Sequence, residues 1–231
     1  MGTRELGIAL AACMYIAYIA FVGKIVMRLL TLRNTSPPFD GGTVSEITPM
    51  TVLKAMGDIF FFSRLFRVNP RLWFGEFFFH FTFSLVLLRH LKYVMDPVPV
   101  WVSALQTPGL CAGYLLPLSL LFIVITKLGI ERKEYVSSYN FSLLGLLFLI
   151  SATGLLIKTV IRLDLVSIKH FMLSVFRFAP GVPSDNGVFV LHYLMAMILL
   201  ACLPTHIYAA PFSVTEARKR EERLSLLMHE K

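Results

Sequence analysis

Five apolar blocks of about 20 residues limit the fold of this chain more than any other feature of its sequence. An α-helix rises ~1.5 Å per residue, so a block of this length crosses a ~30 Å hydrocarbon core. The blocks occupy residues 6–30, 72–95, 110–130, 141–163 and 188–210. We therefore expect an all-α integral membrane protein, a five-transmembrane-helix bundle forming a single membrane domain over residues 1–231.

The positive charges predict how this bundle is oriented. They lie mostly at the ends of the apolar blocks rather than in one patch, which argues against nucleic-acid binding. Fifteen of the 22 Lys and Arg residues fall on one side of the expected bundle and seven on the other. The positive-inside rule then predicts an outer N-terminus, a charged cytoplasmic tail at 211–231 and a multi-pass protein of the cytoplasmic (inner) membrane. We expect the first block to be an uncleaved span, because Lys24 and Arg28 follow it without a small-residue cleavage site.

Two connections have the composition of interfacial amphipathic helices. The cytoplasmic connection 31–71 opens with the turn-rich SPPFDGG and continues as the basic, aromatic MTVLKAMGDIFFFSRLFRVNP. Asn69 and Pro70 are expected to end this helix and start the second span. The outer connection contains SIKHFMLSVFRF, then a turn with a helix cap near residues 184–186.

The cysteines exclude several redox centres. Cys13, Cys111 and Cys202 lie apart from one another within the apolar blocks, and the sequence has no CxxCH or CxxC motif. It also has no glycine-rich nucleotide-binding loop. Covalent haem and iron-sulfur clusters are therefore not expected in this chain, and such carriers would come from another polypeptide.

Four histidines lie inside apolar blocks, where an imidazole is costly and indicates function. His80 and His90 are on the second block, and His192 and His206 are on the fifth. Because the two blocks run in opposite directions, His90 and His192 are expected near the outer end and His80 and His206 near the cytoplasmic end. At ~100° per residue, His192 and His206 lie ~40° apart around their helix and His80 and His90 ~80° apart.

Two facing helices can therefore present two stacked pairs of imidazoles. Paired neutral imidazoles are the axial ligands of six-coordinate haem b. We expect two haem b groups, the inner iron held by His80 and His206 and the outer iron by His90 and His192. A single buried histidine is more often a hydrogen-bonding residue between helices, and this alternative applies to each of the four taken alone. His170 is interpreted as an interfacial or quinone-site residue, and His229 in the tail as solvated.

With these residues identified, the chain resembles the gamma subunit of respiratory nitrate reductase. It is closer to the related cytochrome b subunits of heterodisulfide-reductase-like complexes of sulfate reducers and methanogens. The resemblance covers the whole length, and its most specific part is GDIFFFSRLFRVNPRLWFGEFFFH; SATGLLIK in the fourth block is similar too and supplies small residues where a haem would approach. One difference is ACLPTHIY, which places His206 two residues after Pro204, about one helical turn earlier than the family commonly does.

The resemblance implies a quinol-oxidising or quinone-reducing membrane subunit of a multi-subunit oxidoreductase. Menaquinone or another quinone would react near the outer haem. Electrons would cross to the inner haem and to a cytoplasmic iron-sulfur subunit, heterodisulfide-reductase-like or nitrate-reductase beta-like, or would flow in reverse.

Polar residues beside His90 supply candidates for the quinone site. Lys92 and Asp96 are predicted quinone contacts, and Arg89 is a predicted partner of a haem propionate. Each has a simpler alternative, because Arg89 and Lys92 are long enough to extend to the membrane surface and Asp96 precedes a helix-ending proline. Tyr93 and Gln106 lie nearby, the latter in the expected loop.

Other functions remain as alternatives. A haem-free transporter or sensor would use the intramembrane histidines to move protons, but it would need polar residues in several spans. The cytochrome b anchors of formate dehydrogenase or hydrogenase have four spans, and an assembly scaffold would not need depth-matched imidazoles.

Overall fold

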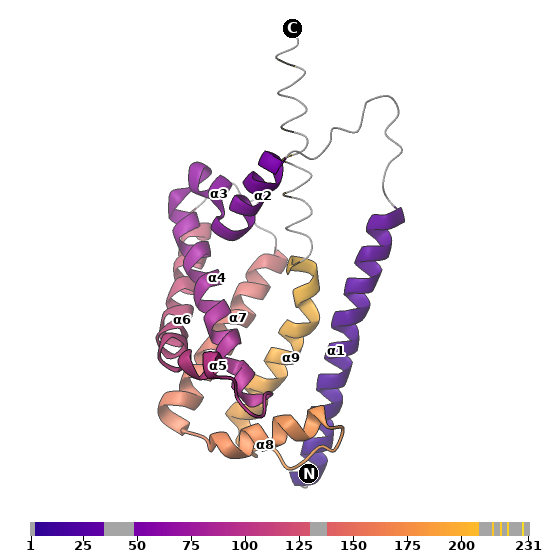
Figure 1. Cartoon of the computed structure of the whole chain (residues 1–231). Coiled ribbons are helices and arrows are strands. Elements are labelled where there is room, and N and C mark those ends of the chain that lie inside the picture. The colour runs from indigo at the N-terminus through magenta and orange to yellow at the C-terminus, as the bar shows by residue number, and fades with distance from the viewer. Residues whose placement is uncertain are drawn as a thin grey trace. The chain divides into compact units, whose positions relative to one another are not determined.

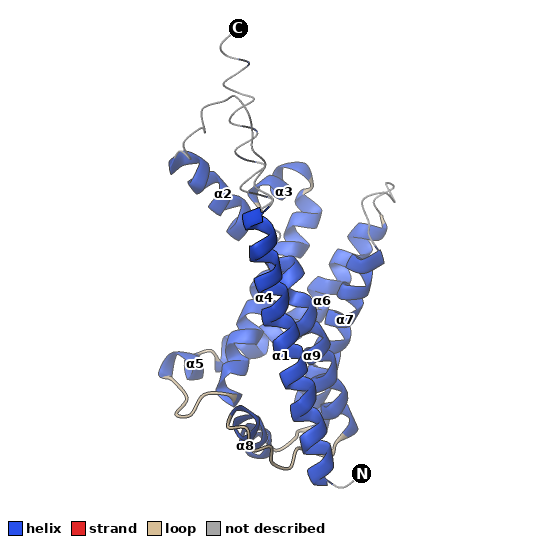
Figure 2. Ribbon diagram, turned by 90° about the vertical axis from the view of Figure 1, so that its right-hand side faces the viewer, coloured by secondary structure: helices blue, strands red, loops and turns tan. Residues whose placement is uncertain are grey.

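The computed structural model describes residues 3–34, 49–129 and 138–207, together with Val214, Arg218, Glu221 and Met228. The SPPFDGG segment and most of the tail, including His229, lie outside the described residues. Every regular element in the described part is a helix, and the described connections are turns and loops (Figure 2).

Five of the described helices are long and apolar enough to span a membrane: α1 (Thr3–Asn34), α4 (Pro70–His90), α6 (Gln106–Leu128), α7 (Ser138–Leu156) and α9 (Gly187–Ile207) (Figure 1). Large apolar side chains lie on their outer surfaces, among them Ile19, Leu118 and Ile198, which are 71%, 61% and 55% exposed. Such surface is unfavourable in water and normal against lipid. The prediction of an all-α fold with five spans is confirmed, and the chain is a multi-pass membrane protein.

The helix ends show local causes for their positions. The Asn69 side chain accepts a hydrogen bond from the Leu72 amide at 3.0 Å, so Asn69 caps α4 at the point where the sequence predicts the second span to start. Helix α6 begins at Gln106, four residues before the predicted span, because Pro108 is tolerated in a first helical turn. Gln106 is thus helical and not in the loop where we expected it. A π-helical turn, η3 (Ile157–Ile161), continues α7 and ends at Arg162, which has a left-handed φ of 52°.

The contacts divide the chain into two compact units, which are described separately. Unit 1 contains Met1–Ala17 and Phe74–Leu199, and unit 2 contains Tyr18–Trp73 and Leu200–Lys231. In unit 1, helix α8 (Leu165–Phe176) runs crosswise to α7 and α9 (Figures 1 and 2). The single-domain organisation stays a prediction.

One apolar cluster fixes α8 to the start of α1 and to α9. Its buried members are Leu10, Ala11, Met14, Ile168, Phe171, Val175, Phe189 and Tyr193. The Tyr15 hydroxyl donates to the Val175 carbonyl at 2.7 Å, and the Tyr193 hydroxyl donates to the Leu10 carbonyl at 3.2 Å. Aromatic burial and satisfied hydroxyls together stabilise this attachment.

The connection between the fourth and fifth spans has the predicted helix and the predicted cap. Asp164 caps α8 by accepting from the Val166 and Ser167 amides at 3.0 and 3.2 Å. Asn186 caps α9 by accepting from the Val188 amide at 3.0 Å, inside the segment where the sequence predicts a cap. The interfacial location of α8 stays a prediction.

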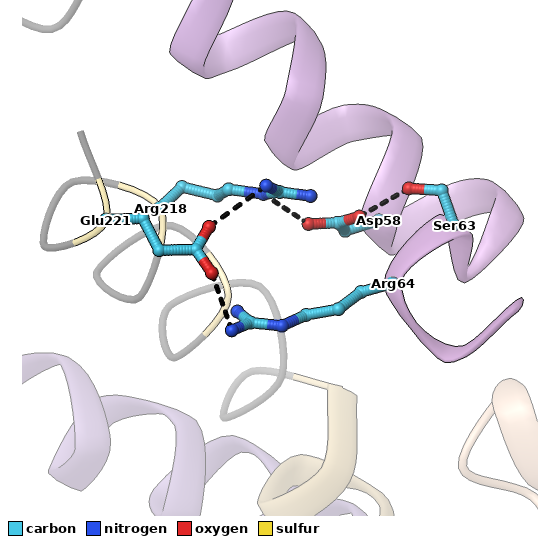
Figure 3. Close-up of polar contacts among 5 residues, drawn as sticks. All are labelled: Asp58, Ser63, Arg64, Arg218 and Glu221. Atoms are coloured by element: carbon cyan, nitrogen blue, oxygen red, sulfur yellow. Dashed lines mark hydrogen bonds and ion pairs between the residues drawn. The ribbon is translucent and has the colours of Figure 1, made fainter. Parts of the chain in front are cut away.

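Unit 2 contains α2 (Pro49–Phe61) and α3 (Ser63–Val68), separated by Phe62 with a left-handed φ of 50°. A polar network ties these helices to the tail (Figure 3). We call it the Asp58 network, and its members are Asp58, Ser63, Arg64, Arg218 and Glu221. The Asp58 side chain is only 3% exposed.

Each charge in the Asp58 network has a partner of opposite sign. Arg218 Nε lies 2.6 Å from Asp58 Oδ2 and its terminal nitrogen 3.0 Å from Glu221 Oε2, while Ser63 donates to the other oxygen of Asp58. Arg64 pairs with Glu221 at 2.7 Å. Burial raises the pKa of Asp58, but the hydrogen bonds from Arg218 and Ser63 outweigh burial and hold the pKa below its ordinary value.

Candidate functional site

The imidazole of His90 is oriented by its own helix. Its Nδ1 lies 2.7 Å from the Val86 carbonyl oxygen one turn earlier in α4. A carbonyl only accepts, so Nδ1 carries the proton and the lone pair is on Nε2. This is the arrangement in which a histidine presents Nε2 to a metal.

The imidazole of His192, on α9, is oriented by α7. Its Nδ1 lies 3.0 Å from Thr153 Oγ1, which also lies 2.8 Å from the Leu149 carbonyl. The single hydroxyl proton of Thr153 is used on its backbone, so the hydroxyl oxygen accepts from His192 Nδ1–H. The lone pair of His192 is therefore on Nε2 as well.

A glycine allows this close approach. A Cβ placed on Gly154 would lie 3.2 Å from Cε1 of His192, closer than side chains normally pack. Gly154 belongs to the SATGLLIK segment, in which the sequence predicts small residues close to a haem. In the structure, the side chain that lies against Gly154 is the imidazole of His192. This imidazole also interacts electrostatically with His90.

Arg89, next to His90, has a buried nitrogen without a partner. Its Nε is the buried side-chain nitrogen that makes no hydrogen bond among the described residues. The aliphatic stem packs on the backbone of α6, since a Cβ on Gly109 would lie 2.6 Å from Arg89 Cδ. An unsatisfied buried guanidinium nitrogen is costly and indicates a missing acceptor.

Two lysines join Arg89 to form what we call the cation cluster, Arg89, Lys92 and Lys158. Lys92, in the short helix η1 (Leu91–Tyr93), is within electrostatic reach of both Arg89 and Lys158. The Lys92 ammonium also lies over the Tyr93 ring, 4.9 Å from its centroid. Within the described part of the chain, no carboxylate pairs with any of the three cations, so the cluster favours an anion.

A cavity of about 460 Å³ lies beside the cation cluster in unit 1. It is lined by Lys92, Tyr93, Asp96, Val98, Leu165, Val166, Lys169, His170 and Leu173. Its size and its mixture of apolar walls and a few polar groups suit a small ligand. The structure thus brings the two predicted quinone contacts, Lys92 and Asp96, into one cavity.

Helix α8 contributes residues that sequence reasoning did not assign to the site. Lys169 Nζ lies 2.9 Å from Asp96 Oδ1, and this hydrogen bond holds the pKa of Asp96 below its ordinary value. His170, for which the sequence left a quinone-site role open, also lines the cavity. The signal for Lys169 was its position beside His170 on an amphipathic helix, but the sequence did not show which face meets Asp96.

The predicted inner pair is only partly described. His80 is on α4 with its Nδ1 2.7 Å from the Glu76 carbonyl, so its lone pair is also on Nε2. The backbone of His206 belongs to α9, and its side chain lies outside the described part. Binding of one iron by His80 and His206 therefore stays a prediction.

The carboxylate of Glu76 was not singled out in the sequence. It pairs with Lys127 of α6 at 2.9 Å, and its other oxygen is 3.9 Å from Nδ1 of His80. Lys127 is one of the fifteen cations that we counted on one side of the expected bundle as orientation charges, and the structure gives it a carboxylate partner on α4. Among the described residues, no three His, Cys, Asp or Glu side chains gather as a metal site.

Two curated proteins are similar to this chain. The Hdr-like menaquinol oxidoreductase cytochrome b-like subunit of Archaeoglobus fulgidus is 26% identical over 82% of this chain and 72% of its own length. The protein of the same name from Archaeoglobus profundus is 26% identical over 66% of this chain, and the chain spans about half (51%) of its length. The chain is therefore a distant homologue of a subunit of a menaquinol oxidoreductase.

No protein-family model matches the chain, and no solved structure matches it. The two relatives support the part of the predicted resemblance that concerns cytochrome b subunits of heterodisulfide-reductase-like complexes. A cytochrome b-like homologue also suggests that the chain binds haem.

Proposed function

We propose that this chain is the di-haem cytochrome b subunit of a respiratory complex, exchanging electrons between quinol and a cytoplasmic iron-sulfur subunit. His90 and His192 would hold an outer haem and His80 and His206 an inner haem. The distant relationship to cytochrome b-like subunits of menaquinol oxidoreductases supports this assignment and favours menaquinol as the quinol.

The orientation of His90 and His192 is the observation that carries the proposal. Two imidazoles on different helices both use Nδ1 in a hydrogen bond and both keep the lone pair on Nε2. A histidine that only joins two helices needs no such matched tautomers. A pair of axial ligands does, because each must offer an unprotonated nitrogen to the iron.

The surroundings of this pair fit a haem. A haem carries two propionates, and the cation cluster beside His90 is without carboxylate partners among the described residues. The orphaned Nε of Arg89 would donate to one propionate, as the sequence predicts, and Lys158 extends the same cluster. The absent Cβ of Gly154 lets the His192 imidazole lie against α7. A bound haem would supply a one-electron carrier at this position.

The residues of the cavity would bind the quinol. Lys92 would donate a hydrogen bond to a quinol oxygen, and Asp96, fixed by Lys169 at 2.9 Å, would orient the ring from another side. Apolar residues such as Leu165 and Leu173 would cover the ring and exclude water.

Haem content after loss of single histidines tests the proposal. The purified full-length chain should bind two haem b groups, measured as the pyridine haemochrome per chain and by the reduced-minus-oxidised spectrum. His192→Ala should lose one haem, and His206→Ala should lose the other. His229→Ala, outside the four-histidine set, is the matched control and should keep both.

The two histidine variants test the outer and the inner haem separately. A wild-type chain with only one haem, which His206→Ala leaves in place, would remove the inner pair and leave the outer pair standing. A wild-type chain without haem would overturn the cytochrome assignment and favour the haem-free transporter or sensor.

A further inference from the structure

We propose that His170 accepts a proton from quinol in the cavity, and that Lys169 is the positioning residue that holds Asp96 for this reaction. The inference rests on the proposed quinol-oxidising function and names the proton acceptor and its support, which the sequence left open.

The placement of His170 follows from how α8 is packed. Val166, Lys169, His170 and Leu173 follow the i, i+3, i+4, i+7 spacing of one helix face, and all four line the cavity. The opposite face is buried, with Phe171 1% and Val175 0% exposed. Because the buried face is fixed by the aromatic cluster, the position of the His170 backbone is set by the fold and not by a mobile loop.

The other polar groups of the cavity are poorly suited to take the proton. The Asp96 carboxylate is held in an ion pair with Lys169 at 2.9 Å, which favours its charged form. Lys92 is a cation over the Tyr93 ring, and the neutral Tyr93 phenol is too weak a base to take up a proton at neutral pH. Histidine is the side chain whose protonation ordinarily changes in the neutral range, so His170 is the group suited to general-base work.

Several charged and titratable groups lie near His170. Asp96 and Asp164 both interact electrostatically with it. The cavity also contains Lys92, Tyr93 and Lys169, and Arg177 lies near Asp96. The two carboxylates would stabilise the imidazolium formed when His170 takes a proton.

The proton and electron balance is that of two-electron quinol oxidation. Both O–H bonds of the quinol break and two C=O bonds form. The two electrons would leave one at a time and be held one each by the one-electron carriers proposed at His90 and His192 and at His80 and His206. His170 takes one proton on a ring nitrogen and releases it to water, because its side chain is exposed. The second proton passes directly to water at the mouth of the cavity.

The test is the pH profile of quinol oxidation by the full-length haem-loaded chain. Menadiol, a soluble naphthoquinol, is mixed with the oxidised chain, and haem reduction is followed from about pH 5.5 to about pH 8.5. His170→Gln keeps hydrogen-bonding capacity but cannot accept a proton in this range. The rate at neutral pH should fall about 100-fold, and the inflection near neutral pH should disappear.

Three further measurements separate a chemical role from a structural one. Added imidazole should restore part of the His170→Gln rate, and the dithionite-reduced spectrum should be unchanged. Lys169→Gln should raise KM for menadiol more than it lowers kcat and should keep the neutral inflection. Asp185→Asn, in the connection after α8 but not in the cavity lining, is the control and should behave as wild type.

The outcomes separate this inference from the proposed function. Wild-type rates in His170→Gln, or a pH-independent loss that imidazole does not restore, overturn the role of His170 while the cytochrome assignment stands. A wild-type chain whose haem dithionite reduces but menadiol does not overturns the quinol site. A chain without haem overturns the cytochrome assignment and this inference with it.

Discussion

The Asp58 network in unit 2 balances its own charges, whereas the cation cluster in unit 1 does not. Asp58, Arg218, Glu221 and Arg64 alternate in sign, at separations of 2.6 to 3.0 Å. Arg89, Lys92 and Lys158 have the same sign and no carboxylate partner among the described residues. Each group contains a charged side chain with buried atoms. These are the Asp58 carboxylate in the Asp58 network and the Nε of Arg89 in the cation cluster.

This difference in charge balance indicates different roles for the Asp58 network and the cation cluster. Removing a charge from water costs free energy unless a partner compensates for it. The Asp58 network is complete without any ligand, so its role is to attach the tail residues to α2 and α3. The cation cluster has no such compensation among the described residues, as we expect of a group that binds an anion.

The largest effect is expected from Asp58→Asn, which removes the negative charge at the centre of the balanced network. Arg218, whose side chain is 14% exposed, would keep its charge without the carboxylate that compensates it. We expect a loss of about 3 kcal/mol in the free energy of unfolding, the low end for a broken buried ion pair. Unfolding in SDS followed by circular dichroism measures it.

A matched variant and a pH series check this interpretation. Arg64→Gln removes a cation whose side chain is 53% exposed, and it should change stability by less than about 0.5 kcal/mol. Because the folded pKa of Asp58 lies below the ordinary 3.8, its contribution is present above pH 3.8 and is lost as pH falls through the folded pKa. Asp58→Asn should therefore lose less stability than wild type in that acidic range. Equal losses in Arg64→Gln and Asp58→Asn would contradict the buried ion pair.

The next largest effect is expected from Arg89→Gln, on the unbalanced side of the comparison. A hydrogen bond to a charged group is worth about 1.5–3 kcal/mol, so haem affinity should fall about 10- to 100-fold. Haem retention on dilution measures this loss. The haem-free variant should be as stable as the haem-free wild type or more stable, because a buried unpartnered nitrogen is removed. Arg177→Gln, outside the cluster, is the control, and an equal loss of haem in both variants would argue against the propionate role.

A smaller effect is expected from Thr153→Val, which removes the acceptor of the His192 Nδ1–H bond. Loss of such an outer partner commonly costs 10–100-fold in affinity, and we expect about tenfold because the valine keeps the shape. Thr159→Val is a matched control, since Thr159 makes the same bond to its own helix and, among the described residues, no hydrogen bond to a histidine. Equal haem affinity in the two variants would show that the hydroxyl does not set the tautomer.

Much of the fold was predictable because a bilayer imposes a length and a polarity on each span. The apolar blocks identify all five long helices, and capping residues such as Asn69 and Asn186 mark where helices begin. The observed helix ends differed from the predicted ones where a local effect decided them, as at Gln106. A first-turn proline is compatible with helix and also with a loop, so sequence alone does not decide between them.

The candidate site was predictable as a set of residue types and not as a set of contacts. His90 and Lys92 were recognisable because polar groups are costly in a span. The partners Thr153, Gly154 and Lys169 come from helices distant in sequence, and which face each helix presents depends on tertiary packing. The pairing of Lys127 with Glu76 was missed for the same reason, since a cation near a span end also fits the positive-inside rule.

The smallest effect, and the sharpest test of the comparison, is expected from Lys158→Gln, because it should have opposite signs in the two forms of the chain. Lys158 is exposed, so its attraction to a bound propionate is worth little, and haem affinity should fall about threefold. In the haem-free chain the same change removes repulsion from Lys92, so stability should rise by a few tenths of a kcal/mol.

Both effects of Lys158→Gln should shrink as salt is added, because exposed charges are screened. Arg162→Gln is the control, since Arg162 is also exposed and its Nε already donates to the Thr159 carbonyl at 3.3 Å. The thermal stability of variant and wild type is compared with and without haem, each at low and at high salt. These four differences give the sign and the salt dependence of the effect. A change of the same sign in both forms would mean that Lys158 acts on the fold of η3 and not on an anion, and the contrast with the Asp58 network would then rest on Arg89 and Lys92 alone.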